Sequence, residues 1–207
     1  MWNYIKKYKN NHNLLFVHTP KCGGSYAAQI FKDLDIKNIG HNKLSPSEFN
    51  NYITFTIIRN PIDRFESFLN FRLNSAIPRI DWPKRLRYLH YDNRVSLNQI
   101  VAKFKDNEFF NFIPYRTLVY WTKDIDIVIT IDELPSFLNF FGYTYNINSF
   151  SKVNVSKKKR GYFNENTKKR LQKLFKDDMI IFNKINENTI DSTMTIFLPC
   201  PLPLYKN

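Results

Sequence analysis

Residues 14–25 read LLFVHTPKCGGS, an apolar run followed by a lysine and two glycines. Its first four residues contain no alternating polar position, which is typical of a strand covered on both faces of a parallel sheet. After the glycines, apolar residues recur at the i, i+3, i+4 and i+7 spacing of a buried helix face. These residues are Ala27, Ile30, Phe31 and Leu34. A strand, a glycine turn and a helix in this order predict the opening unit of an α/β fold.

The same order occurs a second time. Residues 53–58 form another apolar run, ITFTII. Asn60 suits the N-cap of a helix and Pro61 suits its first position, so we expect a helix from there to about Leu73. Its buried face is supplied by Phe65, Phe68 and Leu69.

Three further segments extend the pattern. A third strand is predicted at residues 127–131, followed by a short helix that Gly142 stops. Helices are also expected at residues 96–104 and 164–185. These units are too few for an eight-stranded barrel, so we predict an α/β fold with an open parallel sheet flanked by helices.

The chain shows no internal repeat and no low-complexity linker. We therefore assign residues 1–207 to a single domain, with a core at about 13–186 and an extended, proline-containing tail at 187–207.

The composition indicates a folded, basic protein. Its 207 residues are 43% hydrophobic and carry 31 Lys+Arg against 18 Asp+Glu, a net charge of +13. Such a charge favours a nucleic acid, an anionic membrane surface, a polyanionic glycan or a multiply phosphorylated ligand. AT-rich coding explains the same abundance of lysine and asparagine without any such partner. The charge alone therefore leaves the partner open.

The N-terminal sequence and the two cysteines give little information about location or function. The first nine residues lack the apolar stretch of a secretory signal, and no run approaches the ~20 apolar residues of a membrane span. We expect a soluble protein with no membrane span; the sequence identifies no compartment, although the cytoplasm fits. Cys22 and Cys200 do not form a disulfide framework.

The glycine turn has the character of an anion site. Backbone amides at a strand-to-helix turn, beside a mobile lysine, suit a bound phosphate or sulfate. The spacing differs from that of the nucleotide-binding loop, in which a lysine follows the second glycine; here Lys21 precedes both glycines. This difference argues against a nucleotide kinase.

The two strand-to-helix motifs together resemble those of sulfotransferases that use 3'-phosphoadenosine 5'-phosphosulfate, in particular the carbohydrate (glycan O-) sulfotransferase branch. Those enzymes carry a loop of the form PKTGGT or PKTAST after the first strand, which corresponds to PKCGGS at residues 20–25. Their second motif has an Arg, a Pro and a Ser eight residues after the Arg, which corresponds to RNPIDRFES at 59–67. The resemblance covers about residues 13–186 but is close only at these motifs.

The resemblance implies the sulfotransferase fold, an open sheet like that of P-loop proteins, and a nucleotide donor. In the first motif, the amides of the loop would hold the 5'-phosphate, and Lys21 would neutralise charge on the leaving phosphate. The residues implied here are Lys21, Cys22, Gly23, Gly24, Ser25 and Tyr26. Cys22 stands where the family usually has Thr, so a hydroxyl contact is in doubt.

The second motif and a late basic loop would hold the 3'-phosphate. The resemblance gives this role to Arg59 and Ser67, with Arg64 either a third ligand or a solvated helix arginine. Lys159, Arg160 and Gly161 resemble a step that closes over the 3'-phosphate in related enzymes, although a solvated charge run explains them equally well.

Transfer of a sulfuryl group to a hydroxyl needs a general base, and histidine suits neutral pH. His41 lies between the first helix and the second strand, where glycan sulfotransferases with a histidine base carry theirs, so we expect it to be catalytic together with Lys21. His18 is interpreted as structural or adjacent to the donor. The chemistry needs no metal, and the sequence shows no metal cluster.

Two alternatives stay open. The first is a catalytically weakened relative that keeps the fold for binding. The second is a basic nucleic-acid-binding domain, although no specific nucleic-acid motif is recognisable and the aromatic residues follow core periodicity. The expected acceptor is a hydroxyl, in a carbohydrate by resemblance, and its identity is open.

Overall fold

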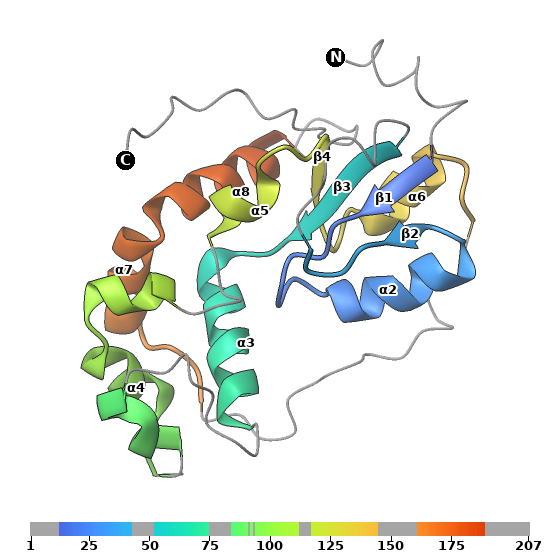
Figure 1. The fold of residues 1–207 in the computed structure, drawn as a ribbon. Helices are drawn as coiled ribbons and strands as arrows, with labels where there is room; N and C mark the ends of the chain where they lie inside the picture. The colour runs from blue at the N-terminus through green and yellow to red at the C-terminus, as the bar shows by residue number, and fades with distance from the viewer. Residues whose placement is uncertain are drawn as a thin grey trace. The chain divides into compact units, whose positions relative to one another are not determined.

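The residues described by the computed structural model are 13–42, 52–74, 84–90, 92, 94–111, 117–144 and 161–188. The chain groups into two compact units (Figure 1). Unit 1 comprises residues 1–58, 121–153 and 184–207, and unit 2 comprises residues 59–120 and 154–183. The assignment to a single domain stays a prediction. Within the described chain, no helix has the length and apolar character needed to cross a bilayer.

Unit 1 is built on a four-stranded parallel sheet with the strand order β2-β1-β3-β4. The strands are β1 (Asn13–Phe16), β2 (Lys37–Asn38), β3 (Tyr52–Ile58) and β4 (Ile127–Thr130). The end strands β2 and β4 differ, so the sheet is open. This confirms the coarse prediction of an open parallel α/β sheet; the sulfotransferase fold itself stays a prediction.

The pairing register of the strands places apolar residues opposite one another. Leu14 pairs with Ile53 and Phe16 with Phe55 between β1 and β3, and Phe55 pairs with Ile127 between β3 and β4. All of these side chains belong to one buried cluster, so they share one face of the sheet. The residues that alternate with them in β3 are also buried, which confirms a strand covered on both faces.

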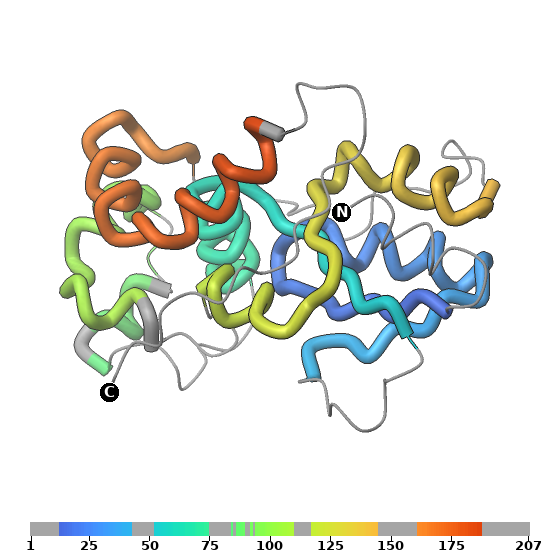
Figure 2. The backbone as a smooth tube through the Cα atoms, turned by 90° about the horizontal axis from the view of Figure 1, so that it is seen from above, coloured from blue at the N-terminus to red at the C-terminus, as the bar shows by residue number. Residues whose placement is uncertain are grey.

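Two helices lie beside the sheet (Figures 1 and 2), and both contribute side chains to that cluster. They are α2 (Gly24–Asp33), which contributes Ala27, Ile30 and Phe31, and α6 (Leu134–Phe140), which contributes Phe137 and Leu138. The sequence spacing predicted the buried face of α2 correctly, because this helix places apolar residues at a period of 3.6 against one apolar surface.

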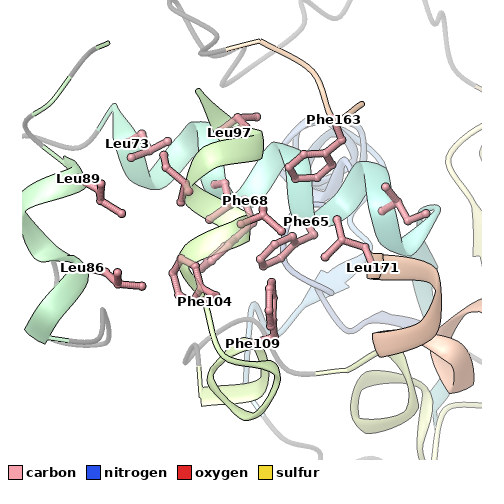
Figure 3. Close-up of a cluster of buried hydrophobic side chains, with 14 of the residues drawn as sticks. Phe65, Phe68, Leu73, Leu86, Leu89, Leu97, Phe104, Phe109, Phe163 and Leu171 are labelled. Carbon is pink, nitrogen blue, oxygen red and sulfur yellow. The ribbon is translucent and has the colours of Figure 1, made fainter. Parts of the chain in front are cut away.

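Unit 2 is helical. It contains α3 (Pro61–Leu73), α4 (Leu97–Lys103), α7 (Glu165–Leu174) and the 3-10 helices η2 (Lys84–His90) and η3 (Asp106–Asn111). Their buried side chains form an aromatic-rich cluster (Figure 3). Its centre is Phe65, whose ring centroid lies 5.5 Å from that of Phe109 and 5.4 Å from that of Phe175.

Side chains of unit 2 form hydrogen bonds with the backbone at the ends of α3 and α4. Asn60 caps α3 as predicted, accepting a 2.9 Å hydrogen bond from the Ile62 amide, and Ser96 forms a reciprocal capping box with Gln99 in α4. At the other end of α4, Arg170 donates to the carbonyls of Val101 and Phe104. The Val101 carbonyl also accepts from the Phe104 amide, whereas the Phe104 carbonyl at the C-cap receives the arginine side chain in place of a helical amide.

The structure corrects the helix predicted over residues 164–185. Two helices occupy this range, α7 and α8 (Lys176–Asn188), with the break at Phe175. Hydrogen bonds of helical spacing continue on both sides, from the Phe175 amide to Leu171 and from the Met179 amide to Phe175. The apolar spacing therefore continues across the break and conceals it. A short helix, α5 (Leu118–Thr122), was not predicted.

Candidate anion-binding and proton-transfer site

The carboxyl ends of β1 and β3 mark the place where a ligand is expected in this sheet. The connection after β1 leads to β2 on one side, and the connection after β3 leads to β4 on the other. In open α/β sheets, ligands bind outside the carboxyl ends of strands at such a switch point. The loop that follows β1 is the HTPKCGGS stretch.

The backbone of the loop turns into α2 through two residues in the left-handed region. Lys21 has φ 65° and Gly23 has φ 86°, and Gly23 is the N-cap of α2. The amides of Tyr26 and Ala27 both donate to the Gly23 carbonyl. The Tyr26 amide is thus already hydrogen bonded, whereas the Gly24 and Ser25 amides stand at the helix positions that have no partner within the helix.

The electrostatics of this helix end favour an anion. In the described chain, α2 has no side chain that caps its N-terminus and no acidic residue in its first turn, and its last turn carries Lys32. The helix dipole places partial positive charge at Gly24 and Ser25, and Lys21 adds a full charge beside them. A phosphate or sulfate oxygen is the ligand that this end suits best.

Gly24 is required by a neighbouring ring. A Cβ atom added there would lie 2.0 Å from Cδ2 of His18. The absence of a side chain thus serves the packing of His18 against the helix end. Gly23 is constrained differently, by its positive φ and by Ile131, whose Cδ1 would lie 3.3 Å from an added Cβ.

His18 is held as a neutral imidazole. Burial, with smaller contributions from the charges of His41 and Lys21, lowers the pKa of His18 from 6.5 to about 4. Its ring stacks on Phe16, with centroids 5.7 Å apart. A neutral ring adds no charge of its own at pH 7, so Lys21 is the cation of this loop.

His41 lies against His18. Their ring centroids are 4.2 Å apart, and Nδ1 of His41 is 2.7 Å from the main-chain carbonyl oxygen of His18. Because a carbonyl only accepts, Nδ1 is the donor, and in the neutral ring Nε2 is left with the free lone pair. His41 is exposed, so this lone pair belongs to a ring that solvent and ligands reach.

Trp121 is the partner of His41 that the sequence did not reveal. It lies in α5, is buried, and meets the His41 ring edge-on with centroids 6.1 Å apart. The two residues are far apart along the chain, and a tryptophan in an unpredicted helix carries no local signal of this contact.

Hydroxyl groups fasten the loop to β3. Thr56 donates from Oγ1 to the Val17 carbonyl at 2.7 Å, and its oxygen lies 2.7 Å from Oγ1 of Thr19. Since the Thr56 proton is used for Val17, Thr19 is the donor in the second bond. Both threonines are completely buried. The start of the loop is thus fixed to the neighbouring strand.

Cys22 is part of the core. Its side chain is buried in the same cluster as Phe31, and its thiol lies 3.6 Å from the Pro20 carbonyl oxygen. A hydroxyl at this position would also face the core, so a Cys or a Thr at position 22 leaves the exposed side of the loop the same. A thiol in apolar surroundings is a poor nucleophile.

The second motif follows β3 directly and begins unit 2. Arg59 is exposed, and Ser67 is half-buried on α3. Arg64 is completely buried, so its interpretation as a solvated arginine is wrong. Burial raises the pKa of Asp178, and the positive charge of Arg64 partly offsets this rise. Asp178 in turn accepts a 2.7 Å hydrogen bond from the Leu118 amide at the start of α5.

The late basic loop is described only at its end. Gly161 is exposed and has φ 98°, a conformation that favours glycine, whereas Lys159 and Arg160 lie outside the described residues. The structure therefore brings Lys21, the glycines, His18 and His41 together in unit 1. It places Arg59, Ser67 and Gly161 in unit 2.

Comparisons with protein-family models, curated proteins and solved structures find no match for this chain. The described residues contain no group of three or more His, Cys, Asp or Glu side chains that could hold a metal ion. The resemblance drawn from the two motifs therefore stays a prediction.

Substitution of Gly24 by Ala should destabilise the protein by about 1–3 kcal/mol, because the new methyl group overlaps His18. In the His18→Ala background the same change should be neutral or stabilising, since alanine is the better helix former. Urea unfolding of the single and double variants gives the coupling. Equal costs in both backgrounds would show that the ring does not restrict position 24.

Acidification should weaken the fold through His18. Its folded-state pKa is lowered from 6.5 to about 4, so its contribution is complete above pH 6.5 and is lost as the pH falls toward 4. The total loss is about 3 kcal/mol. The unfolding free energy should therefore fall by about 2–3 kcal/mol more in wild type than in His18→Phe between pH 7 and 4.5. An equal fall in both proteins would contradict the assignment.

Proposed function

We propose that this protein is a sulfotransferase that moves a sulfuryl group from 3'-phosphoadenosine 5'-phosphosulfate to a hydroxyl group, in a carbohydrate by family resemblance. The hydroxyl oxygen attacks sulfur while the bond from sulfur to the bridging phosphate oxygen breaks. The hydroxyl proton passes to the base, and adenosine 3',5'-bisphosphate leaves with the bridging oxygen. The proposal joins the resemblance at two motifs to the chemistry available at the carboxyl edge of the sheet.

The arrangement of His41 is the observation that carries this proposal. A general base needs a lone pair that a ligand reaches and a second contact that fixes its orientation. Nδ1 of His41 is engaged by the His18 carbonyl at 2.7 Å, which leaves Nε2 as the acceptor. The same His18 precedes the anion-favouring loop by two residues, so the base and the loop share one anchor.

The cations have separate roles. In transfer from a phosphosulfate, negative charge grows on the bridging oxygen, and a lysine beside the 5'-phosphate stabilises it. Lys21, in the loop with the Gly24 and Ser25 amides, is proposed for this role. Arg59 presents a planar, permanently charged fork, which suits the terminal 3'-phosphate and would distinguish this donor from ADP. Ser67, further along α3, is proposed as a hydroxyl donor to the same phosphate.

Adenosine 3',5'-bisphosphate should raise the thermal midpoint more than ADP does. At about 100 times its Kd, the ligand should stabilise the native state by about 2.7 kcal/mol, which is roughly 5–10 °C for a chain of this size. Arg59→Ala should lose most of this shift, because the 3'-phosphate loses its partner.

Arg94→Ala is the matched control for that titration, since Arg94 is an exposed arginine of the same unit that pairs with Asp92 at 3.1 Å. It should behave as wild type. If ADP and the bisphosphate shift the midpoint equally, or if neither does, the proposed donor is wrong.

His41→Ala should lower sulfation about 10²–10⁴-fold, the usual contribution of a general base. The readout is transfer from radiolabelled donor to desulfated heparin. Binding of adenosine 3',5'-bisphosphate should be unchanged, because His41 is assigned to the acceptor proton. Undiminished transfer by His41→Ala would remove this residue from the mechanism while leaving the donor assignment intact.

A further inference from the structure

The positive charge of the chain is concentrated in one unit. Unit 2 carries 20 Lys+Arg against 9 Asp+Glu, a net charge of +11, whereas unit 1 carries 11 against 9, a net charge of +2. Together they give the +13 of the whole chain. The lysines are divided almost evenly, with 11 in unit 1 and 10 in unit 2, whereas all 10 arginines belong to unit 2 and produce its excess of positive charge.

Within unit 2, the basic residues of α7 form two groups: those bonded to other groups of the unit, and those exposed on the opposite side of the helix. Lys168 pairs with Glu165 at 2.8 Å, and Arg170 turns to Asp106 at 2.6 Å and to the carbonyls at the end of α4. Lys168 and Arg170 are therefore engaged in interactions within unit 2. Leu171 and Phe175 occupy the buried face one turn apart.

The opposite side carries three exposed lysines, Lys169, Lys173 and Lys176. They follow one another at i, i+4 and i+7, on successive turns of α7 and at the first residue of α8. Within the described chain none of the three forms an ion pair, although Asp177 lies close in sequence. We call these three residues the lysine stripe.

The lysine stripe is only partly favourable for the helices: Lys173 stands in the last turn of α7, where a cation suits the helix dipole, and Glu165 precedes Lys169 by four residues. Like charges four residues apart repel each other, and a cation at the first residue of a helix opposes the dipole of that helix. A bound polyanion would remove both penalties.

We propose that the lysine stripe is a binding surface for a linear acidic glycan, one that carries sulfate or carboxylate groups. The identification of the ligand as a glycan rests on the proposed function. Lysine ammonium groups act as point charges without the directional fork of arginine, which suits tetrahedral sulfates in any orientation. The stripe contains no aromatic residue on which a base could stack, as single-stranded nucleic acids require. The exposed aromatic residue Tyr162 precedes α7 and is not part of the lysine stripe.

The test uses the triple variant Lys169, Lys173 and Lys176→Ala. Heparin binding should weaken at least tenfold, and the slope of log Kd against log salt should fall by about 2, as expected when three cations no longer release counterions. The matched control replaces Lys32, Lys105 and Lys123, three exposed lysines on separate segments, and removes the same charge. It should keep most of the affinity. Replacement of the stripe by three arginines should restore binding.

Other results overturn the proposal. Equal losses in both triple variants would show that only bulk charge matters, and no heparin binding by wild type at low salt would remove the surface. Tighter binding of oligothymidylate than of heparin, with the same loss in the stripe variant, would assign the stripe to nucleic acid. Neutral dextran should not bind.

The outcome is separable from the proposed function. The stripe variant should keep the thermal shift with adenosine 3',5'-bisphosphate, because the stripe is not assigned to the donor. A missing shift in wild type, together with stripe-dependent heparin binding, would refute the sulfotransferase and leave the glycan surface standing.

Discussion

The parallel pairing of β1 with β3 is the interaction on which the rest of this structure depends. It aligns Phe16 with Phe55 in the core of unit 1 and brings the Val17 carbonyl to the Thr56 hydroxyl. The carboxyl ends of two neighbouring strands thereby lie side by side in the sheet, and the glycine loop follows the first of them. A shift of register by one residue would turn the core side chains of β1 to the opposite face and would misplace the loop.

Packing within the protein constrains the conformation of the glycine loop after β1. His18 occupies the space that a side chain at position 24 would need, and the same residue supplies the carbonyl that orients His41. One residue therefore links the helix end that favours anions to the imidazole that can accept a proton. Because burial keeps the pKa of His18 at about 4, its ring adds no second positive charge beside Lys21 at neutral pH.

Local signals predicted much of the fold. The apolar runs of β1 and β3 and the Asn60 cap act over a few residues, so the sequence displays them directly. The break at Phe175 was hidden because its neighbours keep helical hydrogen bonds, and β2 escaped notice because Lys37 and Asn38 form a two-residue, exposed edge strand. The contact of His41 with Trp121 and the division of charge between the units depend on long-range grouping, which no short pattern encodes.

The order of the segments along the chain has a consequence for synthesis on the ribosome. All four strands have been made once residue 130 has emerged, whereas the aromatic cluster around Phe65 still lacks Phe163, Leu171 and Phe175. Asp178, which fastens the start of α5, arrives later still. At about 5–20 residues per second, the nascent chain spends several seconds with these strands made and with the cluster around Phe65 only partly covered.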